Sequence, residues 1–178
     1  DDLEINEICK NYKVNLHKRS KSLSGDKSST FDLIKEIYFN YLSTKPDIIV
    51  LLQPTSPLRE KTLLSNAINT IKNNKNWSTI IEVFPIQYFT GQINKKYWVS
   101  DLPEDTRSQD ISKKYVPSGR LYLYNCKNTI EINDALGDKV LPIFTEQWKN
   151  INIDEKHDLL KLEFIFNKFK LEYDYLIK

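Results

Sequence analysis

An uninterrupted aliphatic run, IIVLL at residues 48–52, is the feature that most limits the folds open to this chain. A strand with one face in water alternates polar and apolar residues, whereas a strand covered on both faces is apolar throughout. Helical patterns flank the run, with apolar residues at three- and four-residue steps: Phe31, Ile34, Ile37, Tyr38, Tyr41 and Leu42 before it, and Leu63, Leu64, Ala67, Ile68 and Ile71 after it. A second strand, STIIEVF at 78–84, follows. This order predicts an α/β fold in three layers: a mainly parallel sheet with helices on both faces.

The rest of the chain completes one predicted domain, residues 1–178. Residues 85–118 lose the alternation and are predicted to protrude from the body as a hairpin with loops. Two further strands are predicted, GRLYLYN at 119–125 and VLPIFT at 140–145.

Helices are also predicted at 60–74, at 154–176 and near the start of the chain, around Leu3 to Cys9, where a brief strand KVNL follows at 13–16. In the helix at 154–176, four side chains are expected to face inward: Leu159, Leu162, Phe166 and Phe169.

Composition excludes several classes of partner. The net charge of +2, from 26 basic and 24 acidic residues, gives no general reason to bind nucleic acid or a membrane surface. Only two cysteines occur, Cys9 and Cys126, so neither a disulfide scaffold nor a zinc site is expected. The low cysteine content leads us to expect a cytoplasmic location. No apolar stretch approaches the roughly 20 residues of a membrane span.

The chain lacks methionine and opens on DDLEINEICKNY, a charged pair running straight into a helical pattern. We therefore expect that residues encoded upstream are missing from it.

The turn QPTSPLR, residues 53–59, follows the first buried strand. In open parallel sheets, ligands bind beyond the carboxyl ends of the strands. Gln53 offers an amide donor and acceptor suited to a base edge, the prolines fix the backbone, and Thr55 or Ser56 can donate to a ligand or cap a helix. Arg59 suits a phosphate or carboxylate. The alternative is a proline-rich strand-to-helix turn with no ligand.

The string LLQPTSPLR resembles the signature of the acylneuraminate cytidylyltransferase family, which includes CMP-sialic acid synthetases, their legionaminate and pseudaminate relatives and, more distantly, CMP-Kdo synthetases. Three further stretches resemble family motifs in the same order: RSKSLSGDKSSTFD at 19–32, RSQDISKKYVPSGRLYLYN at 107–125 and NINIDEKHD at 150–158. The opening DD and EINEICKNYK also resemble the family's "STDD" turn and the helix after it.

This resemblance implies a nucleotidyltransferase of Rossmann-like fold that transfers CMP from CTP to a nonulosonic acid of sialic, legionaminic or pseudaminic type and releases pyrophosphate, in cell-surface polysaccharide biosynthesis. It implies Asp154 and Arg107 as catalytic residues, and Mg²⁺ held by Asp154 and Asn152. The substrate-binding residues that it implies are Gln53, Thr55, Ser56, Arg59, Arg19, Ser29, Gln109 and Arg120. Because the family's glycine- and basic-rich loop is absent, the fragment itself is expected to be inactive.

Three positions depart from the family pattern: Asn152 replaces an aspartate, Val116 replaces the arginine that grips the sugar carboxylate, and Ser118 replaces an asparagine. Arg120 is expected to substitute for that arginine if its side chain points the same way. Two alternatives follow, a non-catalytic relative that binds nucleotide or a partner protein, and an enzyme for a different acidic sugar. Helix capping remains an alternative role for Ser29 and Asp154.

In the family, the region matching 85–118 is a dimerisation element that reaches the neighbouring subunit's pocket. The aromatic residues here, Tyr88, Phe89, Tyr97 and Trp98, suit such an interface, so a homodimer is predicted. The alternative is that they fold onto their own core as a satellite cluster.

Overall fold

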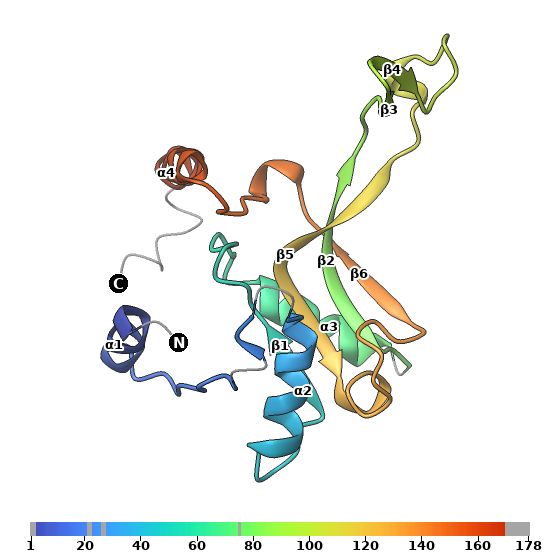
Figure 1. The fold of residues 1–178 in the computed structure, drawn as a ribbon. Coiled ribbons are helices and arrows are strands. Elements are labelled where there is room, and N and C mark those ends of the chain that lie inside the picture. Colours follow the sequence, from blue (N-terminus) through green and yellow to red (C-terminus); the bar gives the residue numbers. More distant parts are fainter. Residues whose placement is uncertain (1–2, 21–22, 26–27, 75, 170–178) are drawn as a thin grey trace.

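The computed structural model describes residues 3–20, 23–25, 28–74 and 76–169. Its helices are α1 Leu3–Asn11, α2 Thr30–Asn40, α3 Leu63–Asn73 and α4 Lys156–Lys168. Its strands are β1 Ile48–Leu51, β2 Thr79–Ile86, β3 Gly91–Asn94, β4 Tyr97–Ser100, β5 Lys114–Asn125 and β6 Val140–Phe144. Short 3-10 turns are η2 Ser108–Asp110, η3 Cys126–Asn128 and η4 Gln147–Lys149 (Figure 1). No helix in the described part of the chain is long and apolar enough to cross a membrane.

The central sheet has the strand order β1-β5-β2-β6. Strand β5 runs antiparallel to both of its neighbours, and β6 runs parallel to β2. Strands β1, β2 and β6 therefore share one direction, and β5 alone opposes them. The predicted α/β class is confirmed, and the sheet is mixed because β5 lies between two strands of the opposite direction.

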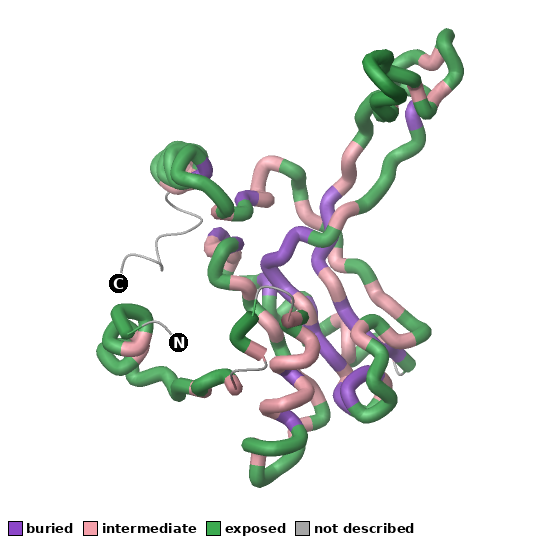
Figure 2. Tube along the Cα trace, viewed as in Figure 1, coloured by how far each residue is buried: buried purple, intermediate pink, exposed green. Residues whose placement is uncertain are grey.

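The two faces of the sheet are covered by different helices, as predicted. Along β5, Leu121 and Leu123 point to one face, where they pack with Ala67 of α3. Tyr124, with Tyr122 beside it, lies on the other face in a cluster with Ile34 of α2. This alternation is the period of two that a strand imposes, and the buried middle of β2 and β5 stands out in Figure 2.

Strands β2 and β5 continue beyond the sheet as a two-stranded ribbon, with Ile86 paired to Lys114. The β3–β4 hairpin lies at the far end of this ribbon, clear of the rest of the chain (Figure 1). We call residues 85–118 the arm. Large apolar side chains on it are exposed, including Ile93 at 70% and Trp98 at 57%.

Several local expectations were wrong. Residues 13–16 form no strand, and α1 buries no side chain. The helix expected at 60–74 begins only at Leu63. In α4, Leu159 is 46% exposed rather than inward, because the helix packs through Leu162, Phe166 and Phe169 instead. Residues 170–176 of that predicted helix lie outside the described residues.

Helix α4 packs directly on the 53–59 turn. Leu58, 1% exposed, and Ile151 form a small core against the inward side chains of α4. Asp158, in the first turn of the helix, accepts hydrogen bonds from the backbone N–H groups of Asp154 and Glu155, at 3.2 and 3.0 Å. The carboxylate of Asp158 therefore fixes the backbone where the chain enters α4.

We predict that Asp158→Asn lowers the free energy of unfolding at neutral pH. The Lys161 ammonium and the backbone N–H groups of Glu155 and Asp154 lower the pKa of Asp158 to about 2. A carboxyl whose pKa is lowered by folding stabilises the fold when ionised, and this contribution is lost as the pH falls through the folded-state pKa. In denaturant unfolding, the wild-type advantage over the variant should be full above about pH 4 and disappear towards pH 2. An advantage that stays constant across this range would contradict the assignment.

Candidate active site

The 53–59 turn is held in a fixed shape by its own backbone and by buried anchors. The Ser56 N–H donates to the Gln53 carbonyl oxygen at 3.1 Å. Ser56 and Leu58 are buried, whereas Thr55 is exposed and Gln53 is half-buried. Pro54 and Pro57 restrict the backbone between these anchors. The turn thus keeps Gln53 at the surface of a rigid loop.

A bulge in β5 lies against this turn. The β2–β5 pairing passes from Ile81–Tyr122 to Val83–Pro117, so residues 118–121 of β5 bulge opposite Glu82. Within the bulge, Gly119 has φ +75°. A Cβ there would stand 2.6 Å from Gln53 Oε1 and 2.9 Å from Ser56 Oγ. The positive φ favours glycine, and a Cβ here would displace the end of the Gln53 side chain, which rests on this glycine.

Residues 150–154, which we call the 150–154 segment, run beside the turn. Burial alternates along the segment, with Ile151 and Ile153 turned inward and Asn152 and Asp154 exposed. The Ile153 N–H donates to the Thr55 carbonyl oxygen at 2.8 Å. The alternation places Asn152 and Asp154 on one face, next to the turn.

Side-chain contacts extend this connection between turn and segment. The Ser56 hydroxyl lies 3.5 Å from Asn152 Oδ1 and 3.4 Å from the Ser118 carbonyl oxygen. The Asn152 amide donates to Asp154 Oδ2 at 2.6 Å. Gln53 and Asp154, which are far apart in the sequence, therefore lie on two loops that contact each other and form one surface.

Arg59 holds the turn to the sheet. Its Nε donates to the Arg120 carbonyl oxygen at 2.8 Å, and its guanidinium also donates to the Gln53 carbonyl oxygen. Arg59 therefore uses its Nε and one further guanidinium nitrogen to hold the turn. The expectation that its charge also binds an anion stays a prediction.

The expectation that Arg120 grips a sugar carboxylate is corrected, because Arg120 is 0% exposed. Its guanidinium donates to Glu60, lies 3.5 Å from Glu82 and donates to Thr145 Oγ1 at 3.2 Å. Its charge is thus neutralised within the protein.

The two carboxylates around Arg120 differ in pKa. Burial raises the pKa of Glu82, and hydrogen bonding from Ser118 and the Arg120 charge only partly offset this effect. Burial also raises the pKa of Glu60, but the Arg120 charge and hydrogen bonds, including that from Lys149, outweigh it and leave the pKa below its usual value. Glu60 is therefore the more firmly ionised partner of Arg120.

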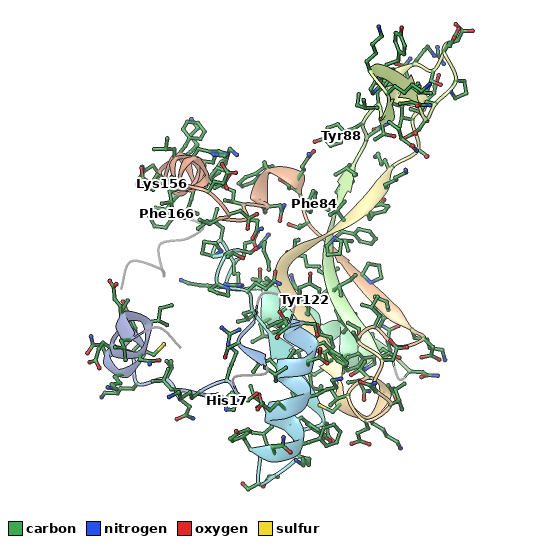
Figure 3. All side chains as sticks on the ribbon, viewed as in Figure 1. His17, Phe84, Tyr88, Tyr122, Lys156 and Phe166 are labelled. Carbon is green, nitrogen blue, oxygen red and sulfur yellow. The ribbon has the colours of Figure 1, made fainter. Side chains whose placement is uncertain are left out.

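Other predicted residues lie apart from the turn. Arg107 and Gln109 are exposed on the arm, where Arg107 forms a two-pronged ion pair with Asp110 at 2.6 and 3.1 Å. Figure 3 shows Phe84 near the base of the arm and Tyr88 farther along it. Arg19 is exposed in the segment that links α1 to α2. Ser29 caps α2, with its hydroxyl accepting from the Asp32 N–H at 3.1 Å.

The donor set at the 150–154 segment is small. The described residues contain no cluster of three or more His, Cys, Asp or Glu side chains able to hold a metal ion. One carboxylate and one amide oxygen nevertheless fit Mg²⁺, which commonly takes one or two protein ligands and completes its shell with water and substrate phosphates. In the structure Asn152 turns its NH2 group to Asp154 and its Oδ1 to the Ser56 hydroxyl, so Asp154 presents the available oxygen and the Asn152 amide would have to turn over to supply a second one.

A cavity of about 880 Å³ lies between η4 and α4, and the start of the 150–154 segment, Asn150 and Ile151, forms part of its wall. Its lining is mostly apolar and includes Trp148, Leu160, Phe164 and Ile165. Such a lining offers little to a triphosphate, so we do not assign the nucleotide to it.

Sequence reasoning did not include Glu60, Glu82 and Gly119 among the site residues. A signal for Glu82 was present, because it is a carboxylate within the apolar run TIIEVF and must find a partner once buried. Arg120, inside the equally apolar GRLYLY, carried the matching signal.

Comparison with known proteins places this geometry in a family. A family model described as cytidylyltransferase matches residues 1–151. The N-acylneuraminate cytidylyltransferase of Escherichia coli O18:K1:H7 is 23% identical over 168 residues, covering 89% of this chain and 38% of that protein. The enzyme of the same name from Streptococcus agalactiae serotype III is 25% identical over 161 residues, covering 86% and 38%. That from Oncorhynchus mykiss is 28% identical over 138 residues, covering 74% and 31%.

The chain therefore spans well under half the length of these relatives. Among solved structures, the 4-diphosphocytidyl-2C-methyl-D-erythritol synthase of Anaerococcus prevotii superposes with a TM-score of 0.54 at 14% identity, covering 98% of this chain and 76% of that one. At this identity the likeness concerns the fold alone. Since the family model covers most of the sequence, and the motif predicted to bind nucleotide forms the turn described above, the chain belongs to the cytidylyltransferase family.

Proposed function

We propose that the complete protein transfers CMP from CTP to a nonulosonic acid of sialic, legionaminic or pseudaminic type, with release of pyrophosphate. Membership of the cytidylyltransferase family supports the nucleotide half of this reaction. The N-acylneuraminate cytidylyltransferases among its relatives support the acidic sugar. The observation that carries the proposal is the contact between the 53–59 turn and the 150–154 segment, at 2.8 Å between Ile153 N and Thr55 O.

The roles follow from the chemistry of each group. Gln53 would read the cytosine edge with its amide, because an amide supplies one donor and one acceptor in a fixed plane. Thr55, exposed beside it, would donate to a ligand oxygen. Asp154 and Asn152 would hold Mg²⁺, which when bound supplies charge neutralisation at the phosphates. The anomeric hydroxyl of the sugar would attack the α-phosphate as pyrophosphate leaves.

A non-catalytic nucleotide-binding relative is the second candidate. Asn152 favours it, because an amide brings no charge to a metal and here its NH2 group donates to Asp154. Weaker magnesium binding would follow.

Pyrophosphate release by the protein from its complete gene, with CTP and a panel of nonulosonic acids, tests the proposal. We expect release that requires Mg²⁺ and one class of acidic sugar. Magnesium-independent CTP binding without release with any sugar would support the second candidate. A folded protein that neither binds CTP nor releases pyrophosphate would refute both.

Gly119→Ala is predicted to weaken CTP binding about tenfold or more, equivalent to about 1.4 kcal/mol. The added Cβ meets Gln53 and Ser56 at distances that atoms do not tolerate, and an L residue is strained at this positive φ. The matched control is Gly25→Ala, because a Cβ at Gly25 meets nothing within 4 Å. Calorimetry with CTP and Mg²⁺ measures both variants. Equal affinity of Gly119→Ala and wild type would show that the turn does not touch the nucleotide.

We also propose a homodimer formed through the arm. A second copy would cover the exposed aromatic residues of the arm, and the arm would carry its exposed Arg107 and Gln109 towards the partner's site. Sedimentation at micromolar concentration should show a dimer, and Trp98→Ser should shift it towards monomer without loss of helix content. A wild-type monomer under these conditions would contradict the proposal.

A further inference from the structure

The candidate site is assembled from two loops that are far apart in sequence, and both are attached to one buried cation. We propose that Arg120 is a positioning residue: from inside the protein it fixes the 53–59 turn and the 150–154 segment relative to each other. This inference rests on the proposed function, because it concerns the same site.

On one side, Arg120 is attached to the turn. Its carbonyl oxygen accepts from Arg59 Nε at 2.8 Å, and Arg59 in turn donates to the carbonyl oxygen of Gln53. Its guanidinium donates to Glu60, the residue directly after the turn. Backbone and side chain of one residue therefore hold both ends of the turn.

On the other side, Arg120 is attached to the chain that leads into the 150–154 segment. Glu60 Oε1 accepts from Lys149 Nζ of η4 at 3.1 Å, directly before that segment. Thr145, between β6 and η4, accepts from the Arg120 guanidinium at 3.2 Å. Arg120 thus reaches the second loop at two points, one direct and one through Glu60.

Ser118 and Glu82, on β5 and β2, also contact Arg120. The Ser118 hydroxyl donates to Glu82 Oε2 at 2.6 Å and accepts from the Arg120 N–H at 3.2 Å. The Ser118 carbonyl oxygen also faces Ser56 of the turn at 3.4 Å. The Ser118 hydroxyl therefore connects the carboxylate of β2 to the bulge, and the Ser118 backbone connects the bulge to the turn.

The geometry favours a planar guanidinium over any other cation. Arg120 must serve Glu60, Glu82 and Thr145 in different directions, which a guanidinium with five donors can do and an ammonium on a flexible stem cannot do in a fixed way. A cavity of about 390 Å³, lined by Glu60, Glu82 and Lys149 together with apolar side chains such as Phe144, lies beside the cluster. Without the guanidinium, Glu60 and Lys149 have room to turn towards this cavity and release both loops.

The experiment distinguishes a role of Arg120 in positioning the two loops from a general contribution to the stability of the fold. Arg120→Met keeps much of the side-chain volume and removes the charge, whereas Arg120→Lys keeps the charge and loses the fork. Ile130→Ala is the control: Ile130 is 1% exposed in the α2 cluster, so this variant loses core packing without touching either loop. The side-chain amide signals of Gln53 and Asn152, recorded by nitrogen-15 NMR, report the two loops without ligand. Calorimetry reports CTP affinity with and without Mg²⁺.

We expect Arg120→Met to move both amide signals, to weaken CTP binding about tenfold or more, and to reduce the gain in affinity that Mg²⁺ provides. Arg120→Lys should recover part of each effect. Ile130→Ala should lower thermal stability and leave the amide signals and the CTP affinity of the folded protein unchanged.

A folded Arg120→Met with wild-type amide signals and CTP affinity would overturn the inference. If Arg120→Met does not fold, Glu60→Gln decides, because it keeps the shape of Glu60 and removes the charge that Arg120 and Lys149 both contact: shifts of the Gln53 and Asn152 signals support the inference and unchanged signals reject it. Failure of the wild type to bind CTP would count against the proposed function alone, since the amide signals are read without nucleotide.

Discussion

A fully buried guanidinium is the constraint from which the rest of this site follows. Arg120 is 0% exposed, so its charge must be met by protein groups: the carboxylates of Glu60 and Glu82 meet it, and Thr145 accepts one of its hydrogen bonds. Removing one partner of a buried ion pair typically costs about 3–5 kcal/mol, because the other charge is left without compensation. Three separate stretches of chain contact Arg120: the end of the turn, strand β2 and the loop after β6. Moving any of them away would incur this cost, so the buried guanidinium keeps them together.

The bulge in β5 lets one strand serve both the core and the site. Below the bulge, β5 pairs regularly with β1 and β2 and supplies leucine to one face and tyrosine to the other. Within it, the chain turns a carbonyl oxygen towards Arg59 and leaves only a hydrogen atom at Gly119 beneath Gln53. Bulges are frequent beside active sites because they redirect side chains without interrupting the sheet.

The sequence predicted those elements of the fold and the site that depend on the spacing of apolar residues along a short stretch of chain. The strand at 48–51, the helices on either side of it and the turn at 53–59 were all visible in residue spacing. The expectation that this strand is covered on both faces was wrong, because β1 lies at the edge of the sheet and Val50 is 40% exposed. The direction of β5 was not, because the connection from β2 runs through the arm, and an apolar strand looks the same in either direction. The role of Arg120 was misjudged for a related reason: its position in a strand gave the face, but only the bulge and the distant Glu60 and Glu82 decide that this face is interior.

A crystal structure of the complete protein with CTP and Mg²⁺ tests the central claim most directly. We predict that the edge of the cytosine lies within hydrogen-bonding distance of the Gln53 amide, with the triphosphate directed towards Asp154. Cytosine bound elsewhere, for example in the apolar cavity between η4 and α4, with Gln53 contacting only Gly119 and water, would contradict it.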